Sequence, residues 1–149
     1  MSEEYRIRYV ETPDDPVWEV VGGGIHAYNL QKAGEQGYQR LCYVLYAPDG
    51  SVAGGLIGAT YWDWLYIDLL FVKEALRRQR YGRQLLALAE AEALRRGAKN
   101  AYLDTFSFQA PEFYTRQGYR VFGELPDFPQ GQTRYFMTKG LATDVHKER

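Results

Sequence analysis

The length and composition of the chain favour one folded domain that needs no disulfide bond. Its 149 residues are 46% hydrophobic and 25% charged, with 18 basic and 19 acidic side chains and a net charge of -1. Cys42 is the single cysteine, no apolar run is long enough to span a bilayer, and the start MSEEYRIRYVE contains no apolar leader. We therefore expect a cytoplasmic protein with no metal and no nucleic acid or membrane partner.

The first half of the chain predicts a strand, a helical region and a hairpin. Residues 5–11 alternate between aromatic or aliphatic and charged side chains, which is typical of a half-buried strand. Helical pieces should follow, joined by a flexible region at the glycines of residues 22–24. Strands are predicted at 41–47 and 51–61, with a turn at Asp63. Residues 65–72 are almost continuously apolar, which favours a central strand covered on both faces.

The second half predicts two helices and three strands. The helices are expected at 81–96 and 110–117, and the strands at 101–106, 119–125 and 133–139. These elements together predict an α/β (α+β) fold. It has a single mixed, mostly antiparallel central sheet of about seven strands flanked by helices. The domain should span residues 5–141 and be followed by a polar tail at 142–149.

The strongest local signal is a basic loop between the strand at 65–72 and the helix at 81–96. Arg77, Arg78, Arg80 and Arg83 lie close to the start of that helix, where unpaired backbone amides and the helix dipole favour a phosphate. Gly82 would let a ligand approach the backbone closely. The cluster is also compatible with a solvated face. Neither a P-loop nor a GxGxxG fingerprint is present in the sequence.

The same loop resembles motif A of the GNAT acyl-CoA N-acyltransferases, [QR]xxGx[GA]. Arg77 occupies the first position of the motif and Gly82 the last, whereas Arg80 replaces the first glycine. Residues 110–119, APEFYTRQGY, are similar to motif B, AxxFYxxxGF, with Tyr114 at the tyrosine position. Ser107 stands where the family often has asparagine. The resemblance covers about residues 5–141.

This resemblance implies a GNAT-like sheet with a splayed pair of central strands and an acetyl-CoA donor. The pantetheine arm would bind between the splayed strands and the pyrophosphate at the loop before the helix. The implied cofactor-binding residues are Leu70, Phe71, Val72, Arg77, Arg78, Gln79, Arg80, Tyr81, Gly82, Arg83, Gln84, Ser107 and Ala110. The implied reaction is N-acetylation, a direct transfer of acetyl to the primary amine of a small molecule.

Two residues are catalytic candidates. In the family, the tyrosine matched by Tyr114 gives a proton or a hydrogen bond to the leaving thiol. Asp68 is the only charge inside LYIDLLFV, and a carboxylate on a central strand needs a partner or a cleft. It could act as the general base, directly or through water, or form a structural pair.

The acceptor site is less specific in the sequence. Trp62, Trp64 and Tyr66 surround one turn and could hold an amine through their aromatic faces, with Tyr28 at the border of the site. The same aromatic residues could instead pack on the sheet or form the surface of a homodimer. Two other functions remain open: acetylation of a protein or peptide amine, and a catalytically silent acyl-CoA-binding module.

Overall fold

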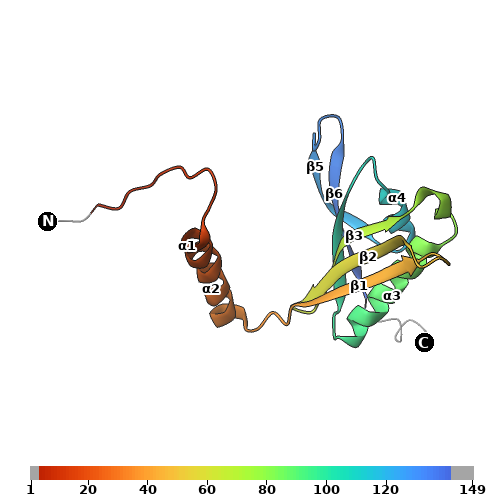
Figure 1. The fold of residues 1–149 in the computed structure, drawn as a ribbon, viewed down its shortest axis with the longest axis horizontal. Helices are drawn as coiled ribbons and strands as arrows, with labels where there is room; N and C mark the ends of the chain where they lie inside the picture. The colour runs from red at the N-terminus through yellow and green to blue at the C-terminus, as the bar shows by residue number, and fades with distance from the viewer. Residues whose placement is uncertain (1–3, 142–149) are drawn as a thin grey trace. The chain divides into compact units, whose positions relative to one another are not determined.

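The computed structural model describes residues 4–141 and divides after Gln36 into two compact units, each described here by itself (Figure 1). The predicted polar tail at 142–149 lies outside the described residues. Within residues 4–141, none of the helices combines the length and the apolar character that crossing a membrane requires.

The first unit is a continuous helical segment preceded by residues without regular structure. The Asp14 carboxylate caps the segment by accepting the Val17 amide at 3.2 Å. Gly22 and Gly23 adopt right-handed helical angles, so the glycine run lies inside the segment and the expected joint between separate pieces is not seen. The elements are α1 (Asp15–Val17), the π-helix η1 (Trp18–Gly22) and α2 (Gly23–Ala33).

The strand predicted at residues 5–11 is not formed. Tyr5, Ile7 and Tyr9 are 90% or more exposed, and their segment is not part of the sheet. Alternation of side chains indicates which residues would share a face, but it does not supply a neighbouring strand to pair with. The sheet therefore has six strands where about seven were predicted.

The second unit is built on this six-stranded sheet, in the order β1-β2-β3-β4-β6-β5. Neighbouring strands are antiparallel except β3 and β4, which are parallel, so the predicted mixed, mostly antiparallel sheet is confirmed. The strands are β1 (Gln39–Tyr46), β2 (Val52–Tyr61), β3 (Trp64–Val72), β4 (Asn100–Phe106), β5 (Arg120–Pro126) and β6 (Thr133–Gly140).

Helix α3 (Tyr81–Arg95) packs against one face of β1, β2 and β3. Its apolar stripe, which includes Leu86 and Ala89, is buried in the core with Leu56, Leu65 and Met137. The 3-10 turn η2 (Glu74–Leu76) precedes α3, and the short helix α4 (Pro111–Arg116) follows β4. The core thus fixes both helices close to the end of β3.

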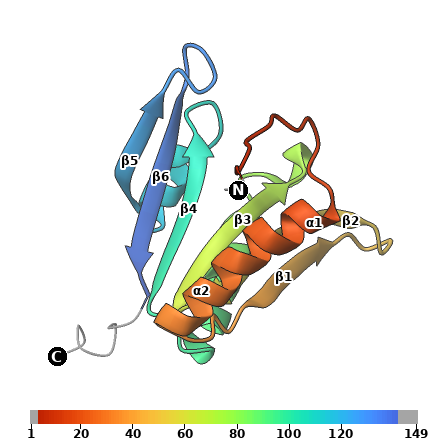
Figure 2. The ribbon, with the colours of Figure 1, turned by 90° about the vertical axis from the view of Figure 1, so that its left-hand side faces the viewer.

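Strands β3 and β4 separate after a short paired stretch (Figure 2). They pair only from Trp64 opposite Asn100 to Tyr66 opposite Tyr102, which confirms the predicted splay. Asp68 is an extra residue in β3 relative to β2, because the register shifts between Ile67 and Leu69. It therefore forms a β-bulge at the point where the two strands diverge.

The bulge at Asp68 also changes which side chains of β3 are buried. Ile67 faces the core before the bulge and Val72 faces it after, so the alternation shifts by one residue. Leu69 and Phe71 are more than half exposed. The apolar run at 65–72 therefore contains a change of face at a bulge, which its continuous apolar pattern did not predict.

Candidate active site

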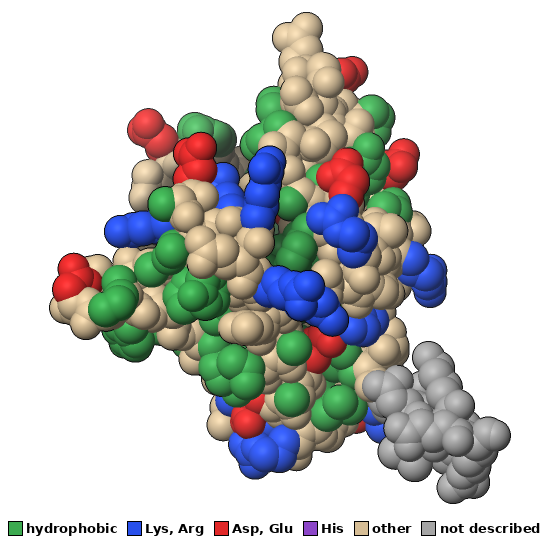
Figure 3. Space-filling view, turned by 90° about the vertical axis from the view of Figure 1, so that its right-hand side faces the viewer, with side chains coloured by type: hydrophobic (Ala, Val, Ile, Leu, Met, Phe, Trp, Pro, Cys, Tyr) green, Lys and Arg blue, Asp and Glu red, His purple; other side chains and the backbone are tan. Residues whose placement is uncertain are grey.

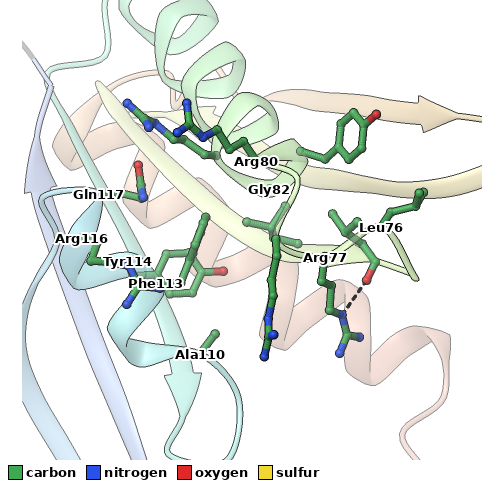
Figure 4. A pocket seen from close by; sticks show the side chains of 14 residues that line it. Leu76, Arg77, Arg80, Gly82, Ala110, Phe113, Tyr114, Arg116 and Gln117 are labelled. Atoms are coloured by element: carbon green, nitrogen blue, oxygen red, sulfur yellow. Dashed lines mark hydrogen bonds between the residues drawn. The ribbon is translucent and has the colours of Figure 1, made fainter. Parts of the chain in front are cut away.

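A cavity of about 400 Å³ lies between the end of β3, the basic loop, the start of α3 and helix α4 (Figure 4). In the space-filling view, Lys and Arg side chains gather around an apolar hollow on this face (Figure 3). The cavity is lined by Leu70, Val72, Leu76, Arg77, Arg78, Arg80, Tyr81, Gly82, Arg83, Ala110, Phe113, Tyr114, Arg116 and Gln117. Five of these residues are arginines, which suits an anionic ligand.

The first turn of α3 offers unpaired backbone donors to this cavity. The amide of Gln84 donates to the Arg80 carbonyl at 3.0 Å, so the amides of Tyr81, Gly82 and Arg83 have no acceptor inside the helix. Gln84 itself therefore has no free amide for a phosphate. Arg80 has φ 69°, in the left-handed region, which explains why a glycine suits this position of motif A.

The edge of β3 also presents backbone groups to the gap. The Lys73 amide donates to the Ala53 carbonyl of β2 at 2.9 Å. Because antiparallel pairing alternates along a strand, Phe71 also turns its backbone groups toward β2, whereas Leu70 and Val72 turn theirs toward the gap. Of the three predicted pantetheine-binding residues, Leu70 and Val72 thus have backbone groups on the open edge.

Arg77 holds the end of β3 in place. Its Nε donates to the Val72 carbonyl at 2.9 Å, and its guanidinium lies 5.5 Å from the centre of the Phe71 ring. Figure 4 shows the first of these contacts as a dashed line. The first residue of motif A is therefore bound to the strand that borders the gap.

A second cavity, of about 470 Å³, adjoins the first. Leu70, Val72, Arg77, Ala110 and Tyr114 line both cavities, so the two meet where β3 and β4 separate. The other residues that line the second cavity are Asp68, Leu69, Phe71, Asp104, Thr105, Phe108 and Gln109. One side of the meeting point is rich in arginine and the other carries two carboxylates.

Tyr114 lies on the wall that the two cavities share. Its side chain is only 9% exposed, and its ring packs edge-on against Phe113 and Tyr119. Burial raises the pKa of the Tyr114 phenol to about 12. The hydroxyl therefore keeps its proton at neutral pH.

Asp68 is exposed at the bulge and lines the second cavity. The Tyr66 hydroxyl makes a long hydrogen bond of 3.4 Å to Asp68 Oδ1. Burial raises the pKa of Tyr66, and the negative charges of Asp68 and Asp104 raise it further. Arg134 opposes this change with the smallest effect.

Asp104 and Arg134 belong to this site and were missing from the sequence-based prediction. Asp104 lines the second cavity, and Arg134 of β6 forms an ion pair with it at 2.8 Å. The sequence pattern that singled out Asp68 also occurs at Asp104, because Asp104 is the one charge in NAYLDTF of β4 and Asp68 is the one charge in LYIDLLFV. The pairing of β4 with β6, 30 residues further on, could not be predicted.

Other predicted cofactor residues lie outside both cavities. The Ser107 hydroxyl donates to Gln132 Oε1 at 2.6 Å and accepts the Thr133 amide at 3.0 Å, so it is bound to the loop before β6. The Gln79 side chain is exposed and makes only a long contact of 3.5 Å to the Ala75 carbonyl. These contacts leave Ser107 and Gln79 out of the lining of the candidate site.

Three of the predicted acceptor residues, Trp62, Trp64 and Tyr66, lie in or next to the β2–β3 turn. Trp64 and Tyr66 both pack on Tyr102, with ring centres 5.9 and 4.9 Å away, and Trp64 lines a separate cavity of about 570 Å³. Trp62 lies in the β2–β3 turn and lines neither cavity of the site. Tyr28 is an exposed residue of α2 in the first unit. Tyr66 alone of these four residues contacts a carboxylate of the site.

Among residues 4–141, no cluster of three or more His, Cys, Asp or Glu side chains is arranged to hold a metal ion. The charged side chains that line the two cavities are those of arginine and aspartate.

The sheet has two splayed strands, a helix N-terminus beside the gap and a tyrosine in the gap, as the resemblance to the GNAT acyl-CoA N-acyltransferases implies. Residues 4–119 match the model of the acetyltransferase (GNAT) family. The chain is 42% identical over 113 residues to an acetyltransferase of Agrobacterium fabrum, covering 76% of this chain and 82% of the relative. It is also 43% identical over 93 residues to the blasticidin-S acetyltransferase of Streptomyces morookaense, covering 62% and 68%.

Among solved structures, an acetyltransferase of Bacillus cereus ATCC 14579 superposes with a TM-score of 0.82 at 34% identity, covering 89% of this chain and 97% of that one. The chain belongs to the GNAT family of acetyltransferases. The resemblance stated from motifs A and B is thereby confirmed, and the chain is an acetyl-CoA-dependent acetyltransferase.

Proposed function

We propose that this enzyme transfers an acetyl group from acetyl-CoA directly to a primary amine of a small molecule. The observation that carries the proposal is the meeting of an arginine-lined cavity with a carboxylate-lined one at Tyr114. The first suits a phosphate-bearing donor and the second suits an amine. The similarity to an enzyme named for acetylating blasticidin S supports a small-molecule acceptor.

The donor is proposed to lie along the gap. The free amides of Tyr81, Gly82 and Arg83 would bind the pyrophosphate, with the surrounding arginines neutralising its charge. The open backbone groups of Leu70 and Val72 would pair with the amides of the pantetheine arm, as with an added strand. The Val72 carbonyl already accepts a hydrogen bond from Arg77 Nε, so the groups open to the donor are the backbone groups of Leu70, the Val72 amide and the amides of the first turn of α3.

The transfer needs a neutral amine and a proton for the departing thiolate. Asp68 is proposed to take a proton from the ammonium group of the acceptor, directly or through water. The amine nitrogen then forms a bond to the thioester carbon and the carbon–sulfur bond breaks. Tyr114, whose raised pKa keeps it protonated, donates a hydrogen bond and then a proton to the sulfur. The new amide nitrogen gives up its second proton, which returns Tyr114 to its protonated form through water, and Asp68 releases the first proton to solvent. No covalent enzyme intermediate is needed.

Substitution at Gly82 tests the donor site. A Cβ at Gly82 would lie 3.5 Å from the Phe113 ring, so Gly82→Val should fold, yet it would block the approach of a phosphate to the backbone. Acetyl-CoA affinity measured by calorimetry should fall at least tenfold, or about 1.4 kcal/mol. Ala87→Val, on an exposed position of the same helix, is the matched control. Unchanged affinity in Gly82→Val would contradict the donor site.

Turnover tests the function itself. Thiol release from acetyl-CoA should be stimulated by small primary amines and not by a peptide that carries the same amine in a bulky context. Release that depends on peptides alone would favour the protein or peptide acetyltransferase. Binding of acetyl-CoA without release, over a broad panel of amines, would favour a catalytically silent module.

A further inference from the structure

The Asp104 carboxylate is bound on one oxygen only by its arginine partner. Arg134 Nε and Nη2 both reach Oδ1, at 2.9 and 2.8 Å. An ionised carboxylate offers about four lone-pair sites on its two oxygens, so Oδ2 can still accept hydrogen bonds. Because Asp104 lines the second cavity, this oxygen is available to a ligand that reaches Asp68 and Tyr114.

Arg134 is itself held rigidly. Its guanidinium lies 5.4, 5.0 and 5.2 Å from the ring centres of Phe106, Phe128 and Phe136. These cation–π contacts with three aromatic rings restrict the guanidinium, and its two donors to one oxygen restrict Asp104 in turn. A carboxylate with a fixed position can bind a ligand group without a further loss of side-chain freedom.

Two carboxylates, Asp68 and Asp104, line the second cavity together with Arg77, which also lines the first cavity. The two carboxylates raise the pKa of the Tyr66 hydroxyl, and Arg134 offsets this only in part. Phe108, whose ring is exposed and stacks on Phe106, lines the same cavity. An aromatic face beside carboxylates is a favourable environment for an organic cation.

We propose that Asp104 selects the acceptor by binding a second, protonated nitrogen of the substrate through Oδ2, while the reacting amine lies near Asp68 and Tyr114. The preferred acceptors are therefore compounds with two amino groups joined by a short spacer. One amino group loses its proton and attacks, and the other stays charged as an anchor. This inference rests on the proposed function and specifies its substrate class.

The wild-type enzyme provides the first test. Diaminoalkanes with three to six carbons are compared with monoaminoalkanes of the same length, and thiol release gives kcat and KM for each. The best diamine should exceed its monoamine by about 10- to 100-fold in kcat/KM, mainly through a lower KM, as expected for a hydrogen bond to a charged group. Equal values for every pair would overturn the inference.

Variants test the residue. Asp104→Asn should bring the ratio of diamine to monoamine kcat/KM close to one, whereas Glu124→Gln, which removes an exposed charge on β5, should leave the ratio at its wild-type value. Arg134→Gln should lower the ratio because Asp104 loses its orientation, and Arg134→Lys should restore part of it. A wild-type ratio in both Asp104→Asn and Arg134→Gln would overturn the assignment.

The controls separate this inference from the proposed function. If Asp104→Asn does not fold, the wild-type comparison and Arg134→Lys still decide, since both concern only the preference for diamines. Acetylation of monoamines and diamines with equal efficiency would overturn the role of Asp104 and leave the proposed function standing. Absence of thiol release with every amine would contradict the proposed function and the inference together.

Discussion

At the scale of single residues, the hydroxyl of Tyr114 is the group most directly tied to the chemistry. Tyr114→Phe keeps the ring that packs against Phe113 and Tyr119 and should lower kcat by roughly 100-fold, a typical general-acid contribution, with little change in acetyl-CoA affinity. Since the pKa of Tyr114 is about 12, its loss of a proton should not reduce the wild-type rate below about pH 11. Single-turnover rates between pH 7 and 10 measure both effects.

Tyr46→Phe is the control for the Tyr114 experiment, because Tyr46 is an exposed tyrosine of β1 outside both cavities. Its single-turnover rate should equal that of the wild type. Equal rates for Tyr114→Phe and wild type would limit Tyr114 to a packing role, and the proton for the thiol would then come from water or from another residue.

Arg80 occupies a backbone conformation that usually favours glycine. Its φ of 69° costs a residue with a side chain about 1 kcal/mol, so Arg80→Gly should increase the free energy of unfolding by about that amount. Arg83 lies three residues further on, inside the first turn of α3, and Arg83→Gly should have the opposite sign, a loss of about 0.5 to 1 kcal/mol. Urea unfolding measures both. A lower free energy of unfolding in Arg80→Gly would contradict the expected cost of the left-handed backbone at Arg80.

The sequence predicted individual site residues where a motif or an isolated charge singled them out. Arg77, Gly82 and Tyr114 were found from motifs A and B, and Asp68 from its position in an apolar strand. The contacts of Ser107 were not predicted, because its partners Gln132 and Thr133 lie 25 and 26 residues further along the chain. Side-chain contacts of this range depend on strand pairing, which local patterns do not reveal.

At the scale of elements, Arg96 connects the end of α3 to the first two strands. Its guanidinium donates to the Gln39 and Arg40 carbonyls at 3.1 and 3.2 Å, to Thr60 Oγ1 at 3.2 Å and to Glu92 Oε2 at 2.8 Å. The side chain is mostly buried. These contacts leave two strand carbonyls dependent on one side chain.

Arg96→Ala should therefore lower the free energy of unfolding by about 1 to 2 kcal/mol, because it removes three hydrogen bonds between the end of α3 and the first two strands together with the packing of a mostly buried side chain. Arg95→Ala removes a neighbouring ion pair that is largely exposed and should change stability by less than about 0.5 kcal/mol. Urea unfolding at neutral pH compares the two variants. Equal effects would contradict the role of Arg96 as the connection between α3 and the sheet.

Glu92 makes this connection sensitive to acid. Hydrogen bonds from Arg95 and Arg96 lower the pKa of Glu92 from 4.5 to about 2. A group whose pKa is lower in the folded state stabilises the fold above its unfolded pKa, and that contribution is lost as the pH falls from about 4.5 toward 2. Glu92→Gln should reduce the dependence of stability on pH within this window, as measured by urea unfolding at several pH values.

Elements with a local signature were predicted closely, and those that depend on distant partners were not. The helix at 81–96 and the turn at Asp63 follow from side-chain spacing and turn chemistry, and the structure has α3 at Tyr81–Arg95 and a left-handed Asp63. The bulge at Asp68 left no such signature, because apolar residues continue on both sides of it. The alternating pattern at residues 5–11 predicted a strand, and the structure has no regular element there.

At the scale of the whole molecule, the lining of both cavities comes entirely from the second unit, between Asp68 and Gln117. The core beneath the site combines residues from β2, β3, α3, β4 and β6, so the site forms only when strands far apart in the sequence have paired. The gap begins where the parallel pairing of β3 with β4 ends. That pairing covers only three residues of β3 and stops just before the bulge at Asp68.

The gap between β3 and β4 also leaves part of the edge of β3 without a neighbouring strand. The outward backbone groups of Leu70 and Val72 could pair with a strand from another copy of the chain, the usual route to aggregation of open sheet edges. Arg77 blocks part of this edge by occupying the Val72 carbonyl. Light scattering from aggregates of Arg77→Ala should therefore begin at a lower protein concentration than for the wild type. Saturating acetyl-CoA should raise that concentration. The bound donor would then protect the enzyme from aggregation by covering the open edge of β3.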